Sequence, residues 1–377
     1  MRVLISCGGT GGHINPGLAI ADIIKQKYPD AEFLFAGTPK GMEAKLVPQA
    51  GYRLETIKVA GFQRRISIEN IGRNAKAVAY LVTSGRRAKE IIEGFKPDIA
   101  IGTGGYAAGP VIRKAARMGI PTAIHEQNAY PGVTNRLLSK EVDYVMLTVK
   151  EALDFMDKSK FEYSVTGLPV RSNINTISKS EARRKLGFND DFTILSFGGS
   201  LGAGCINETM TAAIKWHYGK KLSINHIHGY GGMGRETFPQ AMEAAGIPLR
   251  SDRLRITEYI NDMDVCLAAA DLVICRSGAS TLAELEAAGK ASILIPSPIV
   301  AGNHQYHNAM VLGKAGAAVV IEQKDVTDDR IISEIEKLYN APDRVEVMSK
   351  SAAALHLSDT NERILAVVEK LIAKGKK

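Results

Sequence analysis

Two glycine-rich turns, each directly after a short apolar run, carry the first chemistry that the 377-residue sequence offers. They are Gly8–His13 (GGTGGH) and Gly198–Gly204 (GGSLGAG). Glycines let backbone N–H groups approach an anion closely, and a helix that follows such a turn adds the positive end of its dipole. A tight turn used only to pack a helix on a strand is the alternative. Because the arrangement occurs twice, about one domain apart, we interpret both turns as phosphate- or substrate-contacting, with His13 beside the first.

A third turn, Cys275–Glu284 (CRSGASTLAE), also follows an apolar run and opens a helical pattern. Small side chains at Ser280 and Thr281 leave the first amides of that helix accessible to a pyrophosphate. Glu284 follows about one turn later, where its carboxylate can accept hydrogen bonds from a ribose diol. Ordinary helix-start chemistry would use the same residue types. We favour the nucleotide interpretation because ligands of doubly wound sheets bind where strands end.

The standard nucleotide fingerprints fit this chain poorly. The sequence contains no G-x-x-x-x-G-K-[ST], so it is not a Walker-type NTPase. Residues 102–107 (GTGGYA) do match G-x-G-x-x-[GA] after a strand. A dinucleotide-binding dehydrogenase would carry that pattern in its first βαβ unit, however, and here it comes late in the first half. An NAD-dependent oxidoreductase is therefore the weakest of the functional hypotheses.

Further polar turns suggest ligand contacts rather than a metal site. His125–Gly132 (HEQNAYPG) and Gly302–Asn308 (GNHQYHN) each place several polar side chains together. The histidine spacings, including those of His217, His226 and His228, match no H-E-x-x-H or comparable ligand set. Asp262 and Asp264 form a D-x-D, which can hold a divalent ion, but they precede an apolar helix and are better explained as helix capping. We predict neither a metal nor a cofactor.

Composition limits the class of protein. A hydrophobic content of 45% and a charged content of 23% are those of an ordinary globular protein, and 377 residues suggest two domains. The four cysteines form no C-x-x-C pair, so we expect buried, reduced thiols. No apolar stretch is long enough to span a bilayer, and the N-terminus does not have the pattern of a signal peptide. A formal charge of +8 suits anionic partners: phosphorylated molecules, nucleic acid or an acidic membrane surface.

Apolar runs alternate with helical patterns along the chain, which predicts an α/β fold with parallel sheets covered on both faces. The predicted strands are Arg2–Cys7, Glu32–Ala36, Asp98–Ile101, Thr122–His125, Tyr144–Leu147, Phe192–Phe197, Leu222–His226, Leu254–Thr257, Leu272–Cys275, Ser292–Pro296 and Ala317–Ile321. The pattern restarts after Pro169, so we predict two doubly wound domains with a boundary there. Residues 360–372 read as a final amphipathic helix.

One stretch, Phe62–Ile92, combines many basic residues with apolar ones. Its cations are Arg64, Arg65, Arg73, Lys76, Arg86, Arg87 and Lys89, against the acidic Glu69 and Glu90. A half-buried helix with a solvated basic face explains this composition. A surface that rests on anionic lipid, with apolar side chains inserted, explains it as well.

Taken together and in order, GGTGGHINPG, GTGGYAAGP, HEQNAYPGVTNRLLS, GGSLGA, CRSGASTLAE and GNHQYHNA resemble the MurG family of glycosyltransferases. That family adds N-acetylglucosamine to the lipid-linked muramyl-pentapeptide precursor of bacterial peptidoglycan. The resemblance implies a GT-B fold, in which two Rossmann-like doubly wound parallel-sheet domains face each other across a cleft. Residues 1–168 with the C-terminal helix 359–377 would form the acceptor- and membrane-facing domain, and residues 169–358 the UDP-sugar-binding domain.

The resemblance also assigns residue roles. Thr10, Gly11, Gly12 and His13 resemble the family's loop beside the acceptor diphosphate and sugars, and Tyr106 and Asn128 its polar residues at the reacting sugars. Arg171 and Ser200 resemble donor contacts, Ile260 the residue whose backbone reads the uracil, and Ala279, Ser280 and Thr281 the diphosphate-binding helix start. Glu284 resembles the ribose acceptor and Gln305 a contact to the N-acetylglucosamine hydroxyls. The chain departs from the family at Leu168, where asparagine is expected, and at His304, where some members carry glutamine.

The implied reaction is an inverting transfer from UDP-N-acetylglucosamine (UDP-GlcNAc) that forms a β-1,4 bond to the undecaprenyl-diphosphate-linked muramyl-pentapeptide, without metal or cofactor. His13 is the favoured general base and Glu126 its rival, while His13 could instead bind the acceptor phosphate. The partners would be these two substrates and anionic inner-leaflet lipids, with no nucleic acid, and the protein would lie peripherally on the cytoplasmic side of the cell membrane. A GT-B enzyme with a soluble acceptor, a UDP-sugar epimerase and a non-catalytic binding protein are the alternatives.

Overall fold

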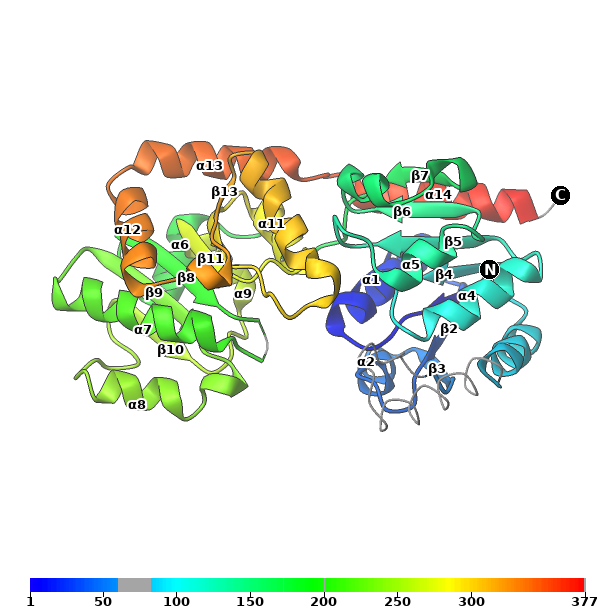
Figure 1. Ribbon diagram of the computed structural model, residues 1–377, viewed down its shortest axis with the longest axis horizontal. Coiled ribbons are helices and arrows are strands. Elements are labelled where there is room, and N and C mark those ends of the chain that lie inside the picture. The colour runs from blue at the N-terminus through cyan, green and yellow to red at the C-terminus, as the bar shows by residue number, and fades with distance from the viewer. Residues whose placement is uncertain (60–82, 172, 200, 376–377) are drawn as a thin grey trace. The chain divides into compact units, whose positions relative to one another are not determined.

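The computed structural model describes residues 1–59, 83–171, 173–199 and 201–375. The chain forms two compact units. Unit 1 contains Met1–Pro169 and Leu357–Lys377, and unit 2 contains Val170–His356 (Figure 1). The chain thus leaves unit 1 once and returns to it for its last helix. Among the described residues, no helix combines the length and the apolar character that crossing a bilayer requires.

Unit 1 is built on a seven-stranded sheet of order β3-β2-β1-β4-β5-β6-β7, in which every neighbouring pair is parallel. Its strands are β1 (Arg2–Ser6), β2 (Glu32–Gly37), β3 (Arg53–Thr56), β4 (Ile99–Gly102), β5 (Thr122–Glu126), β6 (Tyr144–Leu147) and β7 (Glu162–Val165). Parallel strands need crossover connections, and helices supply them here. The central strands are buried on both faces, as their continuous apolar runs predicted.

Helices cover both faces of this sheet. They are α1 (Gly11–Lys27), α2 (Glu43–Gln49), α4 (Ala108–Arg117), α5 (Val133–Leu138) and α14 (Thr360–Gly375), with helical residues 83–95 and the 3₁₀ turns η1 (Lys150–Phe155) and η2 (Lys158–Lys160). Side chains of β1 alternate between the faces: Leu4 packs with α4 and residues 88–92, while Val3 and Ile5 pack with α1 and α14. This alternation follows the two-residue period of a strand.

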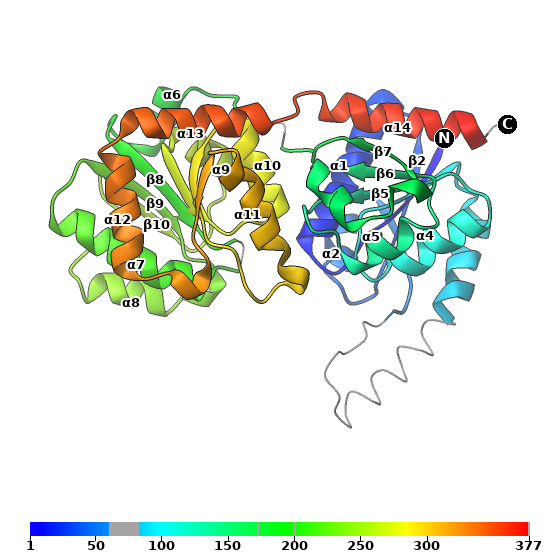
Figure 2. The same ribbon diagram turned by 45° about the horizontal axis from the view of Figure 1, so that its top comes forward.

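The C-terminal helix α14 belongs to the core of unit 1. Its apolar face, formed by Ile364, Val367, Val368 and Leu371, packs with residues of α1 and the sheet. Figure 2 shows α14, in red, lying along this unit. Polar contacts fix its outer side: the hydroxyl of Tyr28 donates a 2.7 Å hydrogen bond to Glu369, and Lys374 Nζ lies 3.0 Å from Asp143. The last helix therefore contributes buried surface to a domain that begins at residue 1.

Unit 2 repeats the architecture with a six-stranded sheet of order β10-β9-β8-β11-β12-β13, again parallel throughout. The strands are β8 (Phe192–Phe197), β9 (Ile224–Gly229), β10 (Leu254–Thr257), β11 (Leu272–Cys275), β12 (Ala291–Leu294) and β13 (Ala318–Val320). The helices are α6 (Lys179–Leu186), α7 (Gly204–Gly219), α8 (Thr237–Glu243), α9 (Met263–Ala269), α10 (Ala279–Ala288), α11 (His304–Lys314), α12 (Asp328–Tyr339) and α13 (Pro342–Leu355), with short turns η3 (Gly232–Gly234), η4 (Ala301–Asn303) and η5 (Gln323–Asp325).

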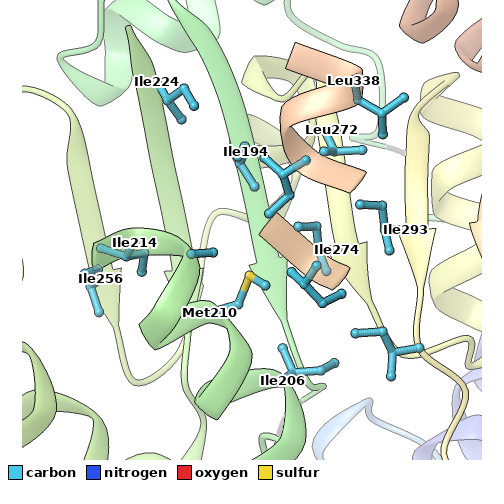
Figure 3. Packing of buried hydrophobic residues seen from close by; sticks show 14 of the residues in the cluster. Ile194, Ile206, Met210, Ile214, Ile224, Ile256, Leu272, Ile274, Ile293 and Leu338 are labelled. Carbon is cyan, nitrogen blue, oxygen red and sulfur yellow. The ribbon is translucent and has the colours of Figure 1, made fainter. Parts of the chain in front are cut away.

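The core of unit 2 lies on both sides of its sheet. On one face, Met210 and neighbouring apolar side chains of α7 point toward Ile194 and Ile274, with Leu338 of α12 beside them (Figure 3). On the other face, α9, α10 and α11 pack against strand residues such as Leu195. Both faces are buried, so the sheet can present ligand-binding groups only at its strand ends.

The predicted strands are present, with ends shifted by up to three residues. Two strands were missed, β3 (RLET) and β7 (EYSV). Each is an outermost strand of the sheet in unit 1, and neither is fully buried, so neither has the apolar run that identified the others. Helix α1 begins at Gly11, so the end of the glycine-rich stretch and Pro16 are themselves helical.

Candidate functional site

In both units, the glycine-rich turns lie where the strand order reverses. In unit 1, β1 and β4 are neighbours in the centre of the sheet, and their carboxyl ends lead into Gly8–His13 and Gly102–Gly105. In unit 2, β8 and β11 take the same positions and lead into Gly198–Gly204 and Arg276–Gly278. Connections diverge to opposite faces at such a point, which leaves a crevice that doubly wound folds use for ligands.

Two of the helices that begin here have no side-chain cap. Thr10 and Gly278 are the N-cap residues of α1 and α10, and in the described part of the chain neither helix has a side-chain cap. The first N–H groups of a helix have no partner within the helix and carry its positive partial charge. These two helix starts can therefore donate hydrogen bonds to an anion. They include Gly11, Gly12, Ala279, Ser280 and Thr281, all predicted as site residues.

The first glycine turn is held by a carboxylate that sequence reasoning missed. Glu43 is fully buried and accepts hydrogen bonds from the N–H of Gly9 at 3.0 Å and from both the N–H and the hydroxyl of Thr38, at 2.8 and 2.6 Å. Burial alone would raise the pKa of this carboxyl, but the hydrogen bonds from Thr38 and Gly9 outweigh it and lower the pKa below its ordinary value. A Cβ at Gly8 or Gly41 would lie 2.7 or 2.2 Å from its oxygens, so any other residue there would displace the carboxylate.

His13 lies in the first turn of α1, with its ring between two other segments. Its Nδ1 is 3.2 Å from Oε1 of Gln127, the residue that follows the predicted rival base Glu126. A Cβ at Gly104 would approach that same Nδ1 to 2.7 Å, and Gly104 has a φ of +106°. Two of the turns singled out in the sequence, 102–107 and 125–132, thus meet the first glycine turn at His13. Tyr106, which lies in the first of these turns, is 63% exposed.

Glu126 has a different environment from His13. Its side chain is 1% exposed and accepts four hydrogen bonds within its own turn. Oε1 accepts from the N–H and side-chain amide of Asn128, and Oε2 from the N–H of Gly132 and the amide of Asn135, at 2.9 to 3.1 Å. A carboxylate with this many donors organises the turn, and it orients Asn128, another predicted site residue.

In unit 2, two predicted donor-contacting residues are ion-paired. Nε of Arg171 donates a 2.7 Å hydrogen bond to Oε1 of Glu284, on the second turn of α10. The Glu284 carboxylate beside it raises the pKa of Arg171, so the guanidinium stays charged. The side chain of Glu284 is 15% exposed and that of Arg171 54%, so the pair lies at the surface of the unit. Oε2 of Glu284 can still accept further hydrogen bonds.

Gln305, at the start of α11, is tied to the β11–α10 turn. Its backbone carbonyl accepts a 2.7 Å hydrogen bond from the hydroxyl of the buried Ser277, and its Oε1 accepts one of 2.9 Å from the N–H of Ser297. Among the described residues, none accepts a hydrogen bond from its Nε2. Arg276 is also fixed, through the carbonyls of Ile295 and Pro296. The turn that opens α10 is therefore held rigidly by its neighbours.

The structure changes one predicted feature in unit 2. Asp262 takes the N-cap position of α9 but makes no side-chain cap; its carboxylate instead binds Arg255 at 2.7 and 2.8 Å. The capping explanation was therefore wrong for Asp262, because Arg255 offers two charged donors. Ile260, predicted beside the uracil, is 6% exposed, and its side chain packs on Gly229 at the end of β9. In the described ranges, no three His, Cys, Asp or Glu residues are placed to hold a metal ion.

Three of the histidines once considered as ligands form a buried hydrogen-bonded chain. His217 Nε2 lies 3.0 Å from His226 Nδ1, and the hydroxyl of Ser196 lies 2.8 Å from both His226 Nε2 and His228 Nδ1. Burial lowers the pKa of His217 to about 4 and that of His228 to about 3. All three stay neutral at pH 7 and belong to the interior of unit 2.

Some predictions fall partly or wholly outside the described residues. Ser200 is one of them. Of the basic stretch Phe62–Ile92, residues 62–82 are also outside. The remaining cations form ion pairs: Arg86 with Glu90, Arg87 with Glu55 and Glu90, and Lys89 with Glu93. Glu55 and Glu93 lie beyond the stretch that was counted, so its described end is less unbalanced in charge than the sequence suggested.

Comparison with known proteins identifies the family of this chain. Residues 3–147 match the glycosyltransferase family 28 N-terminal domain, and residues 193–364 match the family 28 C-terminal domain. The chain is 45% identical over 374 residues, 99% of its length and 98% of the relative's, to a protein of Acetivibrio thermocellus. It is 42% identical over 376 residues, 99% and 100% of the two chains, to a protein of Desulforamulus reducens. Both are named UDP-N-acetylglucosamine--N-acetylmuramyl-(pentapeptide) pyrophosphoryl-undecaprenol N-acetylglucosamine transferase.

The solved structure of Acinetobacter baumannii MurG is similar with a TM-score of 0.79 and 27% identity, covering 98% of this chain and 99% of that one. The two doubly wound parallel-sheet units, together with the family 28 matches, show a glycosyltransferase of the GT-B class, as predicted. Within that class, the chain belongs to the MurG family of glycosyltransferase family 28.

Proposed function

We propose that this protein transfers N-acetylglucosamine from UDP-GlcNAc to the 4-hydroxyl of the undecaprenyl-diphosphate-linked N-acetylmuramyl-pentapeptide, which converts lipid I to lipid II in peptidoglycan synthesis. The names of its full-length relatives support both substrates. The observation that carries the proposal is that each unit has a helix start without a side-chain cap at the switch point of its sheet. One such site suits each of the two diphosphate-containing substrates.

The donor belongs to unit 2 in this proposal. The amides of Ala279, Ser280 and Thr281 would bind the UDP diphosphate and stabilise the charge that develops on it as the sugar leaves. Glu284, already oriented by Arg171, would accept hydrogen bonds from the ribose hydroxyls through its remaining lone pairs. The remaining assigned contacts are Ile260 to the uracil through its backbone, Gln305 to the sugar hydroxyls through Nε2, and Ser200 to the phosphates. In this proposal the amides at the start of α10 neutralise the leaving group without a metal ion.

The acceptor belongs to unit 1. Thr10, Gly11 and Gly12 would contact its diphosphate and sugars at the start of α1, while Tyr106 and Asn128 would contact the reacting sugars. The Gly9 amide is occupied by Glu43, so the acceptor diphosphate would use the amides of α1 that follow it. Glu43 therefore sets the position of the turn without contacting the substrate.

His13 is the general base in this proposal. The acceptor 4-hydroxyl attacks C1 of the donor sugar, the bond from C1 to the UDP oxygen breaks with inversion, and the hydroxyl proton passes to the imidazole. Glu126 was the rival base. Its four hydrogen bonds and 1% exposure favour the role of turn organiser, with Asn128 as the group that it positions.

We further infer peripheral binding on the cytoplasmic side of the cell membrane, since the acceptor's polyprenyl tail remains in the bilayer. Anionic inner-leaflet lipids would attract a chain of formal charge +8. The product supplies cell wall synthesis, and through it cell shape and division. Vesicle flotation with and without anionic lipid tests the membrane inference: equal recovery with neutral vesicles would contradict the lipid preference.

The direct test is product formation from UDP-GlcNAc and a synthetic lipid-linked muramyl-pentapeptide diphosphate. We expect UDP release that depends on the acceptor. Release of UDP or isomerisation of the sugar with the donor alone would indicate an epimerase. Turnover of an acceptor that lacks the lipid or the diphosphate would indicate a different GT-B transferase. Absence of turnover would indicate a binding protein. A thermal-shift series of UDP-GlcNAc, UDP-glucose, UDP-galactose and NAD checks the donor independently, with stabilisation expected from the first.

Substitution of His13 by alanine tests the base. We expect kcat to fall by about 10²- to 10⁴-fold, the usual contribution of a general base. The matched control is Asn135→Leu, which removes a buried amide from the adjacent turn without contacting His13. Retention of nearly full turnover by the folded His13→Ala variant would exclude the role.

A further inference from the structure

The orientation of the Gln127 side chain is fixed by the atoms around it. Gln127 is 2% exposed and directly follows β5. One end of its amide lies 3.0 Å from the carbonyl oxygen of Thr103, 2.9 Å from that of His125 and 3.2 Å from His125 Nδ1. Carbonyl oxygens only accept hydrogen bonds, so this end must be the NH₂ group. The other end, Oε1, therefore faces His13.

This orientation determines which nitrogen of neutral His13 carries the proton. Oε1 of Gln127 lies 3.2 Å from Nδ1 of His13 and has no hydrogen to donate. Nδ1 must therefore be the donor, and a neutral imidazole with a hydrogen on Nδ1 has its lone pair on Nε2. Among the described residues, none forms a hydrogen bond with that Nε2. The free lone pair is thus on the nitrogen that faces away from Gln127.

His125 gives an independent check on the same network. Its Nε2 is 2.9 Å from the carbonyl oxygen of Gly167, so Nε2 carries a hydrogen and Nδ1 is an acceptor. That Nδ1 faces the NH₂ of Gln127, in agreement with the amide orientation given by the carbonyls. Complete burial lowers the pKa of His125, which keeps this ring neutral and the acceptor available.

The His13 ring also lies directly against the backbone of Gly104. A Cβ at that position would lie 2.7 Å from Nδ1 and 2.9 Å from Cε1, so the absence of a side chain at Gly104 lets the ring approach this closely. The hydroxyl of Thr103 donates a 2.7 Å hydrogen bond to the carbonyl of His13 and fixes the backbone that carries the ring. The ring is thus bounded by glycine backbone on one side and by Gln127 at Nδ1.

We propose that Gln127 is a positioning residue that holds neutral His13 as its Nδ1–H tautomer, so that Nε2 accepts the proton of the acceptor hydroxyl. The inference rests on the proposed function for its catalytic meaning. In the transfer step, the O–H bond of the acceptor breaks, the oxygen forms its bond to C1, and the proton goes to Nε2. The imidazolium that results still donates from Nδ1 to Gln127, so the contact is kept through the step. A neutral amide orients the ring without adding a buried charge.

The tautomer can be measured without any substrate. The full chain is labelled with ¹⁵N-histidine for NMR. Two-dimensional spectra that correlate the ring nitrogens with the protons on the ring carbons distinguish the Nδ1–H tautomer from the Nε2–H tautomer. The signal that disappears in His13→Gln belongs to His13. We expect wild type to show the Nδ1–H form and Gln127→Met to lose that preference. Gln127→Glu keeps an oxygen toward Nδ1 and should retain it. An Nε2–H tautomer in wild type, or the same Nδ1–H form in Gln127→Met, would overturn the proposal.

Asn135→Leu is the matched control for damage to the turn. Asn135 donates to the carbonyl of His125 and to Glu126, so its loss disturbs the same turn but leaves the Gln127–His13 contact in place. We expect it to lower the unfolding temperature as much as Gln127→Met does, with the His13 tautomer unchanged. A loss of the Nδ1–H form in Asn135→Leu as well would assign the effect to general disruption and overturn a specific role for Gln127.

Kinetics then test the catalytic meaning. We expect Gln127→Met to lower kcat roughly tenfold, less than loss of the base itself, with both KM values within about twofold and partial rescue in Gln127→Glu. Unchanged kcat in a Gln127→Met protein that has lost the tautomer would overturn the positioning role. If wild type lacks transferase activity altogether, the proposed function fails, while the spectra still decide the tautomer.

Discussion

Arg171 and Glu284 are 113 residues apart in the chain, and Nε of the arginine donates a 2.7 Å hydrogen bond to Oε1 of the glutamate. The pair joins the first residues of unit 2 to the helix that begins with uncapped amides. It fixes the rotamer of the Glu284 carboxylate, which we propose as the acceptor of the ribose hydrogen bonds. A preoriented acceptor loses less conformational freedom on binding than a free side chain does.

The first prediction concerns this pair. Glu284→Ala should raise the KM for UDP-GlcNAc by about tenfold or more, because one ribose hydrogen-bond acceptor is worth about 1.4 kcal/mol or more in binding. Arg171→Ala should have a smaller effect, since it loosens the carboxylate without removing it. Glu346→Ala, at an exposed Glu–Lys pair on α13, is the control. Steady-state kinetics with the acceptor saturating measure both. A donor KM within twofold of wild type in Glu284→Ala would contradict the ribose contact.

The second prediction concerns Glu43 and the first glycine turn. The Glu43 carboxylate accepts from three donors, the N–H of Gly9 and the N–H and hydroxyl of Thr38. In Glu43→Gln an NH₂ group faces at least one of these donors, so the free energy of unfolding should fall by about 1–3 kcal/mol. Because hydrogen bonding lowers the folded-state pKa, the wild-type contribution is present above the ordinary carboxyl pKa near 4.3 and is lost as pH falls below it. Denaturant unfolding at pH 7 measures the difference. Glu93→Gln, on the exposed side of residues 83–95, should change stability by less than about 0.5 kcal/mol.

The third prediction is an acid sensitivity of unit 2. His217 and His228 have folded-state pKa values near 4 and 3, so the unfolded chain binds protons first as pH falls below about 6.5. The free energy of unfolding should therefore fall between about pH 6.5 and 4. His217 alone contributes on the order of 3 kcal/mol over this range, at about 1.4 kcal/mol per pKa unit.

Urea unfolding at several pH values checks this. His217→Gln should flatten the pH dependence of the free energy of unfolding. Equal slopes for His217→Gln and wild type would show that another group dominates.

The fourth prediction concerns the cysteines, all of which are free thiols. Burial raises the pKa of Cys7 and of Cys266 to about 12 and also raises that of Cys275, so these three hold almost no thiolate at pH 8. Cys205 is only half-buried, and we expect it to react first with a disulfide reagent. Counting thiols released over time in native and denatured protein tests this. Rapid reaction of all four in the native state would contradict the described burial.

The amino-acid sequence by itself determined the architecture. Continuous apolar runs such as Phe192–Phe197 identify strands buried on both faces, and the helical patterns between them require parallel pairing. Glycine turns stand out after two such runs because only glycine combines a positive φ with close backbone approach, and the strand order of the structure puts both turns at switch points. The edge strands β3 and β7 were missed since their side chains are not fully buried and carry no comparable pattern.

Only the tertiary structure decided how the side chains near these turns are used. Glu43 and Gly9 are 34 residues apart, and Gln127 and His13 are 114 apart, so no local pattern could have paired them. Asp262 was predicted to cap a helix, but in the folded chain its carboxylate binds Arg255. Burial and hydrogen bonding set the charge, the tautomer and the orientation of each such group. Burial and hydrogen bonding depend on which residues, distant in the sequence, surround the group. Those residues come together only when the chain folds.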